Sequence, residues 1–176
     1  MKKRIPIAFT GYAGCGKDTA AEPLIAAGWE RWCFGDIIKD IFDPLVLKHL
    51  GFSAHTKDRE QKKLIRGLLV HGGEAFYDVV FNTYFSPTSI VRQGPLPVVN
   101  TRLMRVREAE EWKKLGGIII EIVRPGLAPA EPCEAEWLEE IRQGGFIDRT
   151  IHNGGTERML HQAVCMIAGI PMTPKA

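Results

Sequence analysis

The sequence predicts an α/β domain in which a five-stranded parallel sheet is flanked by helices. Short apolar runs alternate with longer segments of helical pattern, which is typical of parallel sheets with right-handed crossovers. The segment 118–123 is the clearest strand, because it is rich in β-branched residues. A length of 176 residues is sufficient for one domain, 1–176, with its own hydrophobic core.

The individual elements follow from hydrophobic periodicity and from the positions of glycine. Strands are expected over 5–10, 29–34, 96–99, 118–123 and 146–151. Helices are expected over 17–27, 36–42, 56–85, 106–115, 134–142 and 156–168. Asp36 could cap the second helix, because aspartate is favoured at that position. Gly72 and Gly73 are expected to break the third helix.

The composition argues against several classes of protein. The chain carries 23 Lys+Arg and 21 Asp+Glu, a net charge of +2, which argues against a broad nucleic-acid-binding surface. No apolar run approaches the roughly 18 residues of a membrane-spanning helix. The four cysteines are far apart and form no CxxC pair, so neither a zinc site nor a disulfide framework is expected. We therefore expect a cytoplasmic protein that binds neither nucleic acid nor membranes.

The strongest motif is Gly11-x4-Gly16-Lys17, which stands between an expected strand and an expected helix. Glycines let backbone N–H groups approach a phosphate closely, since they lack a Cβ and tolerate positive φ. The helix that begins near Lys17 directs the positive end of its dipole at the same anion. Lys17 is expected to reach the β- and γ-phosphates and to neutralise charge during transfer. The motif therefore predicts an ATP-binding phosphate loop.

Two positions depart from the usual magnesium site of such loops. A Ser or Thr hydroxyl after the lysine usually holds Mg²⁺, but Asp18 stands there and Thr19 follows. An acidic residue usually ends a neighbouring strand, but Asn100 stands there. Two interpretations of Asp18 remain open: it supplies Mg²⁺ with the carboxylate that Asn100 lacks, or it only caps the helix.

Several stretches resemble the bacteriophage deoxynucleoside monophosphate kinases, which are relatives of the adenylate kinases. Residues 16–19, Gly-Lys-Asp-Thr, resemble the phosphate loop of this family. Four further stretches resemble the family in the same order. Residues 34–39 resemble its Phe/Asp/Lys segment, and residues 98–103 resemble its Asp-Val-Arg-Phe strand end. Residues 116–125 resemble its fourth strand with the start of the lid, and residues 147–156 resemble its last strand and turn. Only the phosphate loop is specific by itself, and the others gain weight from their order over nearly the whole chain.

The resemblance implies a P-loop kinase with ATP as co-substrate, Mg²⁺ as cofactor and a deoxynucleoside monophosphate as acceptor. It further implies an acceptor-binding helical region at about 35–95, a mobile lid at about 124–146 and, if the protein is of phage origin, a location in the host cytoplasm. The expected ATP-binding residues are Gly11, Ala13, Gly14, Cys15, Gly16, Lys17, Asp18, Thr19 and, near the adenine, Asn153.

The expected catalytic residues are Lys17, Arg102 and Arg124, and the acceptor-binding residues are Asp36, Lys39, Arg66 and Arg102. Arg102 is the best supported of the acceptor group. It follows a central strand at the edge where open α/β sheets bind ligands, and its planar fork matches a phosphate. Each of three residues has an alternative role. Lys39 could lie on a solvated helix face, Asp36 could be a helix cap, and Arg102 could form a surface ion pair.

Two other functions remain open. One is a dephospho-coenzyme A kinase or another small-molecule kinase on the same fold. The other is a nucleotide-binding protein without catalysis, which Asn100 would favour because an acidic residue is expected there. The residues do not specify the preferred base, the choice between deoxyribose and ribose, or the oligomeric state, so a homodimer is also open.

Overall fold

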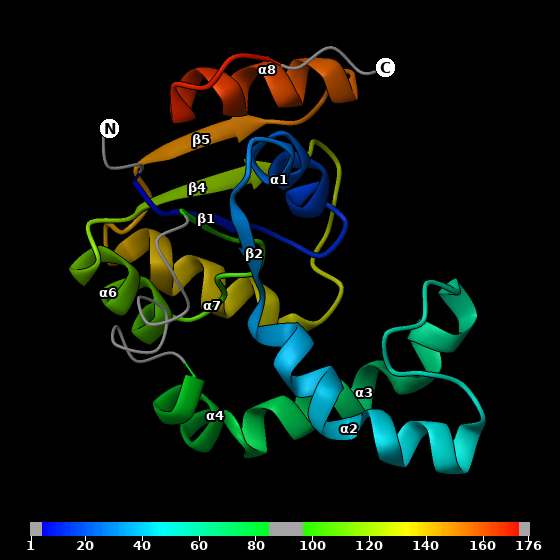
Figure 1. Ribbon diagram of the computed structural model, residues 1–176. Helices are drawn as coiled ribbons and strands as arrows, with labels where there is room; N and C mark the ends of the chain where they lie inside the picture. The colour runs from blue at the N-terminus through cyan, green and yellow to red at the C-terminus, as the bar shows by residue number, and fades with distance from the viewer. Residues whose placement is uncertain (1–4, 85–96, 173–176) are drawn as a thin grey trace. The chain divides into compact units, whose positions relative to one another are not determined.

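The computed structural model describes residues 5–84 and 97–172. The chain divides into two compact units (Figure 1). The sheet unit comprises residues 1–32 and 91–176, and the helical unit comprises residues 33–90. The described residues of the helical unit, 33–84, fall almost entirely within the 35–95 region that was expected to bind the acceptor, and residues 85–95 of that region lie outside the described ones.

The sheet unit contains five parallel strands in the order β2-β3-β1-β4-β5. These strands are β1 (Ile7–Thr10), β2 (Glu30–Trp32), β3 (Val98–Asn100), β4 (Ile118–Val123) and β5 (Arg149–His152). Every neighbouring pair is parallel, which confirms the expected architecture. The second strand is shorter than expected, because Phe34 already begins a helix, and the fifth begins at Arg149 rather than at Phe146.

In the described residues of the sheet unit, four helices cover the two faces of this sheet. They are α1 (Lys17–Ala26), α6 (Val106–Lys114), α7 (Pro132–Gln143) and α8 (Glu157–Ala168). Helices α1 and α8 lie on one face, and α6 and α7 lie on the other (Figure 1). The core beneath α1 and α8 includes the buried side chains of Phe9, Leu24, Ile120 and Val164. Burial of each large apolar side chain of this kind stabilises the fold by roughly 1.5–3 kcal/mol.

The segment expected to form a lid, 124–146, contains two different structures. Residues 124–131 hold no helix or strand, whereas α7 follows with Pro132 in its first turn, where the missing N–H of proline costs nothing. Leu138 and Ile141 of α7 are buried, so this helix packs as the crossover between β4 and β5. The hypothesis of a mobile lid therefore applies best to residues 124–131.

The described part of the helical unit contains α2 (Phe34–Leu50), α3 (Arg59–Ala75) and α4 (Tyr77–Tyr84). One apolar cluster of this unit contains the buried side chains of Val46, Ala54 and Ile65. The α2–α3 connection is held by the Asp43 carboxylate, which accepts hydrogen bonds from the Ser53 hydroxyl and the Ala54 N–H at 2.7 Å each. In the described parts of the chain, no helix has the length and apolar character needed to cross a bilayer.

Two expectations for the helical unit were wrong. Gly72 and Gly73 lie inside α3, which continues to Ala75, and the interruption falls at Phe76. Gly72 serves close packing, because a Cβ there would lie 2.5 Å from the Phe42 ring. Asp36 does not cap α2, since the N-cap is Cys33 and Asp36 lies within the first turn.

Candidate active site

The phosphate loop joins β1 to α1 and adopts the conformation that its glycines allow. Gly11, Gly14 and Gly16 have φ values of 126°, 83° and 107°, a region that other residues rarely adopt. Gly16 is also the N-cap of α1, and no side chain caps this end of the helix. The first N–H groups of α1 therefore remain open to an anion at the positive end of the helix dipole.

Lys17 is partly buried and folds back over the loop that precedes it. Its ammonium donates hydrogen bonds to the carbonyl oxygens of Gly11 at 2.6 Å and Tyr12 at 2.8 Å. Burial lowers the pKa of this amine, and the positive charge of Arg102 acts in the same direction, against the raising effects of Cys15 and Glu134. Lys17 and Arg102 thus form the positive part of the site, in a setting where charges interact strongly.

Cys15 behaves as a small apolar side chain within the loop. It is 1% exposed, and burial raises the pKa of its thiol despite the neighbouring Lys17 ammonium. The thiol therefore stays protonated near neutral pH, and it fills space beneath the loop.

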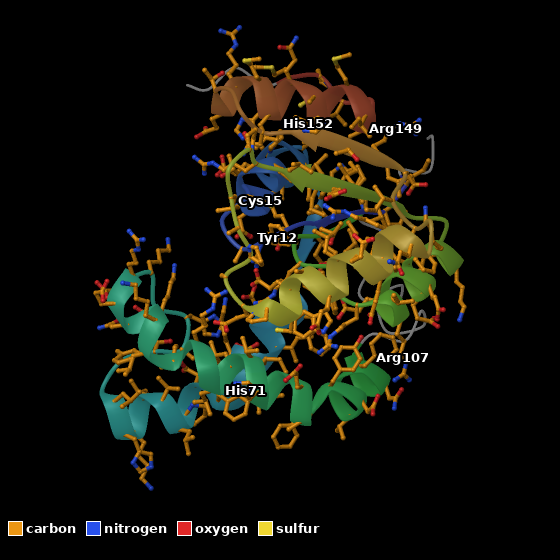
Figure 2. All side chains as sticks on the ribbon, turned by 180° about the vertical axis from the view of Figure 1, so that it is seen from behind. Tyr12, Cys15, His71, Arg107, Arg149 and His152 are labelled. Atoms are coloured by element: carbon orange, nitrogen blue, oxygen red, sulfur yellow. The ribbon has the colours of Figure 1, made fainter. Side chains whose placement is uncertain are left out.

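Asn153 holds the phosphate loop through a hydrogen bond to its backbone. Its side-chain amide donates a hydrogen bond of 2.8 Å to the Cys15 carbonyl, and a Cβ on Gly16 would lie 2.5 Å from the same nitrogen. Tyr12 and Cys15 lie with His152 at the carboxyl ends of the strands, whereas Arg149 lies at the opposite edge (Figure 2). Asn153 was expected to lie near the adenine. The structure adds its contact with Cys15, which the sequence did not indicate because the two residues are 138 positions apart in the chain.

The two arginines that flank the expected lid differ in their surroundings. Arg124 is exposed, and its guanidinium donates to the Gly14 carbonyl at 3.4 Å, so it lies at the rim of the phosphate loop. Arg142 donates to the buried Glu121 carboxylate of β4 at 2.5 Å. Arg142 is thereby anchored to the sheet, and Arg124 is the better candidate for a contact with nucleotide phosphates.

Uncharged polar groups gather where β1 and β3 end. Asn100 is completely buried, and its Oδ1 accepts the Arg102 N–H at 2.8 Å. Within residues 5–84 and 97–172, the Asn100 Nδ2, the Thr10 hydroxyl and the Thr101 hydroxyl have no hydrogen-bond partner. Each buried polar group without a partner costs about 1–3 kcal/mol, so water or a ligand at this strand edge would recover stability.

Glu108 supports the turn that carries Arg102. It lies in the first turn of α6, is 2% exposed, and accepts the Met104 N–H at 2.8 Å. Burial raises its pKa to about 7, although bonds from the Met104 and Arg105 N–H groups and the charge of Arg102 act against this rise. The sequence showed an acidic residue at the start of a helix but gave no sign that it would be buried.

Glu134 is another buried carboxylate that could not be recognised from the sequence. Its Oε2 accepts hydrogen bonds from the Ala13 N–H of the phosphate loop at 3.3 Å and from the Ala130 N–H at 3.1 Å. It therefore joins the loop to the segment that precedes α7.

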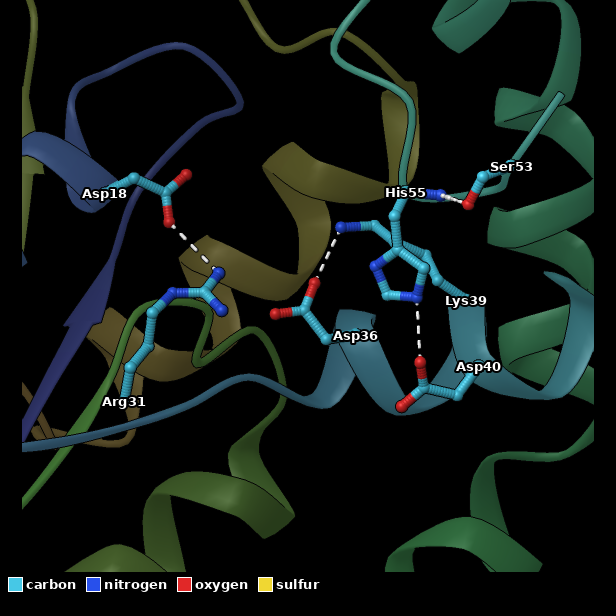
Figure 3. Close-up of polar contacts among 7 residues, drawn as sticks. All are labelled: Asp18, Arg31, Asp36, Lys39, Asp40, Ser53 and His55. Carbon is cyan, nitrogen blue, oxygen red and sulfur yellow. Dashed lines mark hydrogen bonds and ion pairs between the residues drawn. The ribbon is translucent and has the colours of Figure 1, made fainter.

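The Asp18 carboxylate is exposed rather than bound to its own helix. Its side chain is 81% exposed and lies 3.4 Å from the Arg31 guanidinium of β2 (Figure 3). Because Gly16 is the N-cap of α1, the interpretation of Asp18 as the cap was wrong. An exposed ion pair of this kind is worth at most about 1 kcal/mol, so the carboxylate can exchange its partner at little cost.

The expected acceptor residues fall in both units. Asp36 and Lys39 form an ion pair of 2.7 Å on α2 (Figure 3), and Arg66 lies on α3 of the same helical unit. Arg102 belongs to the sheet unit. The structure thus brings Asp36 and Lys39 together, and their role toward an acceptor stays a prediction.

One group of three side chains in the described parts of the chain has the spacing of metal ligands. It consists of Glu22 on α1 and of Glu157 and His161 on α8, with ligand atoms within 4.8 Å of one another. The His161 Nε2 already lies 2.9 Å from the Thr19 carbonyl oxygen. Asp18 does not belong to this group.

A pocket of about 440 Å³ lies beside the turn that contains Asn153. It is formed by β5, the following turn and α8, and its lining includes His152, Asn153, Thr156 and Met159. Such a size and mixed lining suit a small organic ligand.

Comparisons with known proteins give a fold but no sequence family. No protein-family model and no curated protein matches the chain. Among solved structures, it is similar to a dephospho-CoA kinase from Campylobacter jejuni, with 15% identity, 92% of this chain and 94% of that chain covered, and a TM-score of 0.52. It is also similar to a shikimate kinase from Aquifex aeolicus, with 17% identity, 93% and 95% covered, and a TM-score of 0.52. The chain therefore has the fold of the P-loop kinases.

Proposed function

We propose that the protein is a small-molecule kinase that transfers the γ-phosphoryl group of ATP to a deoxynucleoside monophosphate. The observation that carries this proposal is the phosphate loop, in which three glycines with positive φ precede a helix N-terminus without a side-chain cap and a lysine lies over the loop. Backbone N–H groups, the helix dipole and an ammonium together match a polyphosphate.

Each cation has a proposed role in the transfer. Lys17 leaves the two loop carbonyls and binds the β- and γ-phosphates, where it stabilises charge on the transferring group. Arg124, at the rim of the loop, binds the same phosphates from the side of residues 124–131. Arg102 is proposed to hold the acceptor phosphate, because it follows the carboxyl end of β3 and its positive charge lowers the pKa of Lys17.

The adenine of ATP is proposed to occupy the pocket beside Asn153. This pocket adjoins the phosphate loop through Asn153, which bonds the Cys15 carbonyl. Apolar side chains such as Met159 and Leu160 supply a surface for the base, and polar groups of the turn can fix its orientation.

The residues present fit a hydrated Mg²⁺ ion, which would neutralise charge on the phosphates. The polar atoms of Thr10, Asn100 and Thr101 that lack partners suit water molecules of the ion, and Asp18 offers the carboxylate that Asn100 lacks. Measuring ATP affinity with and without Mg²⁺ tests this assignment apart from turnover. An Asp18→Asn variant in which Mg²⁺ strengthens ATP binding as much as in the unmodified protein would remove Asp18 from the site.

A panel of acceptors tests the proposed reaction. The protein is incubated with ATP and each of the four deoxynucleoside monophosphates, their ribose counterparts and dephospho-coenzyme A, and ADP formation is measured. Lys17→Ala, prepared in the same way, controls for contaminating kinases. Turnover limited to dephospho-coenzyme A would replace the proposed substrate by this alternative, which the fold also accommodates. ATP binding without turnover on any acceptor would favour a nucleotide-binding protein without catalysis, as the uncharged Asn100 suggests.

A further inference from the structure

Glu134 is a buried carboxylate that the roles proposed above leave unused. It lies in the first turn of α7 and is 3% exposed. A single oxygen, Oε2, accepts both the Ala13 N–H of the phosphate loop at 3.3 Å and the Ala130 N–H at 3.1 Å. One side chain thus connects the loop to the segment 124–131, although Ala13 and Glu134 are 121 positions apart in the chain.

Capping of α7 explains only one of these two hydrogen bonds. Glutamate in the first turn of a helix commonly reaches back to N–H groups that precede the helix, and the bond to Ala130 is of this kind. The bond to Ala13 reaches a different element and contributes nothing to α7. A carboxylate that served only as a cap could remain at the surface, where it would not lose its hydration.

The charges around Glu134 also relate it to the phosphate loop. Lys17 and Glu134 attract each other electrostatically, whereas Arg102 repels Lys17. Hydrogen bonds from N–H groups to a carboxylate are about twice as strong as those between neutral groups, so the contact with Ala13 restrains the first half of the loop. On the other side of the loop, the guanidinium of Arg124 donates to the Gly14 carbonyl at 3.4 Å.

We propose that Glu134 is a positioning residue for ATP binding. Its carboxylate holds the phosphate loop at Ala13 in the conformation that presents the following N–H groups to phosphate. It holds residues 124–131 to the same point, so that a movement of this segment is transmitted to the loop. Glu134 itself touches neither substrate. The proposal rests on the proposed function, because it assigns ATP to this loop.

The test compares Glu134→Gln with the unmodified protein. Glutamine keeps the shape of the side chain and an oxygen that can cap α7, but it removes the charge. We expect the dissociation constant of ATP, measured by calorimetry, to rise roughly 10-fold, while that of the deoxynucleoside monophosphate stays within twofold. Amide hydrogen exchange should accelerate in residues 11–16 and 126–131 together. Glu136→Gln is the control, since Glu136 is exposed on the same helix.

Three results decide the proposal. An unchanged ATP affinity together with unchanged exchange in residues 11–16 would overturn it. Faster exchange confined to α7 and Ala130, with ATP affinity unchanged, would reduce Glu134 to a cap and overturn it as well. If the unmodified protein binds no ATP, the proposed function fails, but coupled exchange of the two segments in the ligand-free protein still decides the role of Glu134. Should Glu134→Gln fail to fold, Glu134→Asp, which keeps the charge on a shorter side chain, undergoes the same two measurements.

Discussion

The two units of the molecule differ in the polar side chains that they bury and in the large apolar side chains that they expose. In the described parts of the sheet unit, polar or charged side chains are buried at six positions: Thr10, Asn100, Thr101, Glu108, Glu121 and Glu134. The described part of the helical unit buries no polar or charged side chain to this extent and instead exposes large apolar ones: Ile41, Leu45, Leu47, Leu50, Leu64, Leu68, Phe76 and Val79.

This difference indicates which unit is organised for function at a cost in stability. Burying a polar group lowers stability unless it is fully bonded, so a concentration of such groups marks a region organised for binding or catalysis. The described part of the helical unit has an apolar cluster around Val46, Ala54 and Ile65 but exposes eight large apolar side chains, and we expect lower local stability there. Substitutions of polar side chains around the phosphate loop should therefore act mainly on chemistry, and those of apolar side chains in the helical unit mainly on stability.

The largest effect is expected at Lys17. Lys17→Ala should lower turnover by at least ~100-fold, because the main electrostatic contact with the transferring phosphoryl group is lost. Circular dichroism should show a folded protein, since the hydrogen bonds of the lysine go to the nearby loop, to the Gly11 and Tyr12 carbonyls and the Cys15 sulfur. Near-normal ATP-dependent turnover in a folded variant would refute the assignment of the phosphate loop.

The buried charge of Glu108 should make stability depend on pH. The native state holds the proton more tightly than the unfolded state, because the pKa rises from 4.5 to about 7. The stability from this group is therefore full below pH 4.5 and is lost as the pH rises through about 7, by up to about 3 kcal/mol.

Urea unfolding between pH 5 and 8 measures this loss. Glu108→Gln should remove most of the fall, whereas Glu110→Gln, an exposed position of the same helix, should not. Parallel stability curves for the unmodified protein and Glu108→Gln would show that the buried carboxylate carries no such cost.

A substitution of Arg102, in the sheet unit, should affect the binding of the two substrates differently. Arg102→Ala should weaken acceptor binding by roughly 10- to 150-fold, the effect of losing a charge-assisted contact of about 1.5–3 kcal/mol, and should change ATP binding far less. Calorimetric titrations with each substrate measure both constants. Equal weakening of both, or of ATP alone, would move Arg102 to the ATP side.

The smallest effect is expected for two glycines of α3 in the helical unit. Gly72→Ala brings a Cβ within 2.5 Å of the Phe42 ring, and we expect a loss of about 1 kcal/mol in the free energy of unfolding as the ring is displaced. Gly67→Ala meets no atom within 4 Å and should instead stabilise α3 by about 0.5–1 kcal/mol. Thermal unfolding should separate the two variants, and equal shifts would mean that Gly72 has no packing role.

The sequence predicted what depends on neighbouring residues and missed what depends on distant ones. The phosphate loop and β4 could be identified because their glycines and β-branched residues act locally. The contacts of Asn153 with Cys15 and of Glu134 with Ala13 could not, since they form only after distant segments pack together. Gly72 was misinterpreted because a missing Cβ permits a turn and close packing equally.

The contacts of Lys17 make ATP binding an exchange rather than an addition. Its ammonium already has two carbonyl acceptors, at 2.6 and 2.8 Å from Nζ, before any phosphate arrives. A phosphate that draws this ammonium away must compensate for both bonds, so only the difference contributes to affinity. The heat released on binding a triphosphate should accordingly be smaller than a count of new contacts would give. The heat released should match the number of new contacts only for a ligand that does not displace Lys17 from the loop carbonyls.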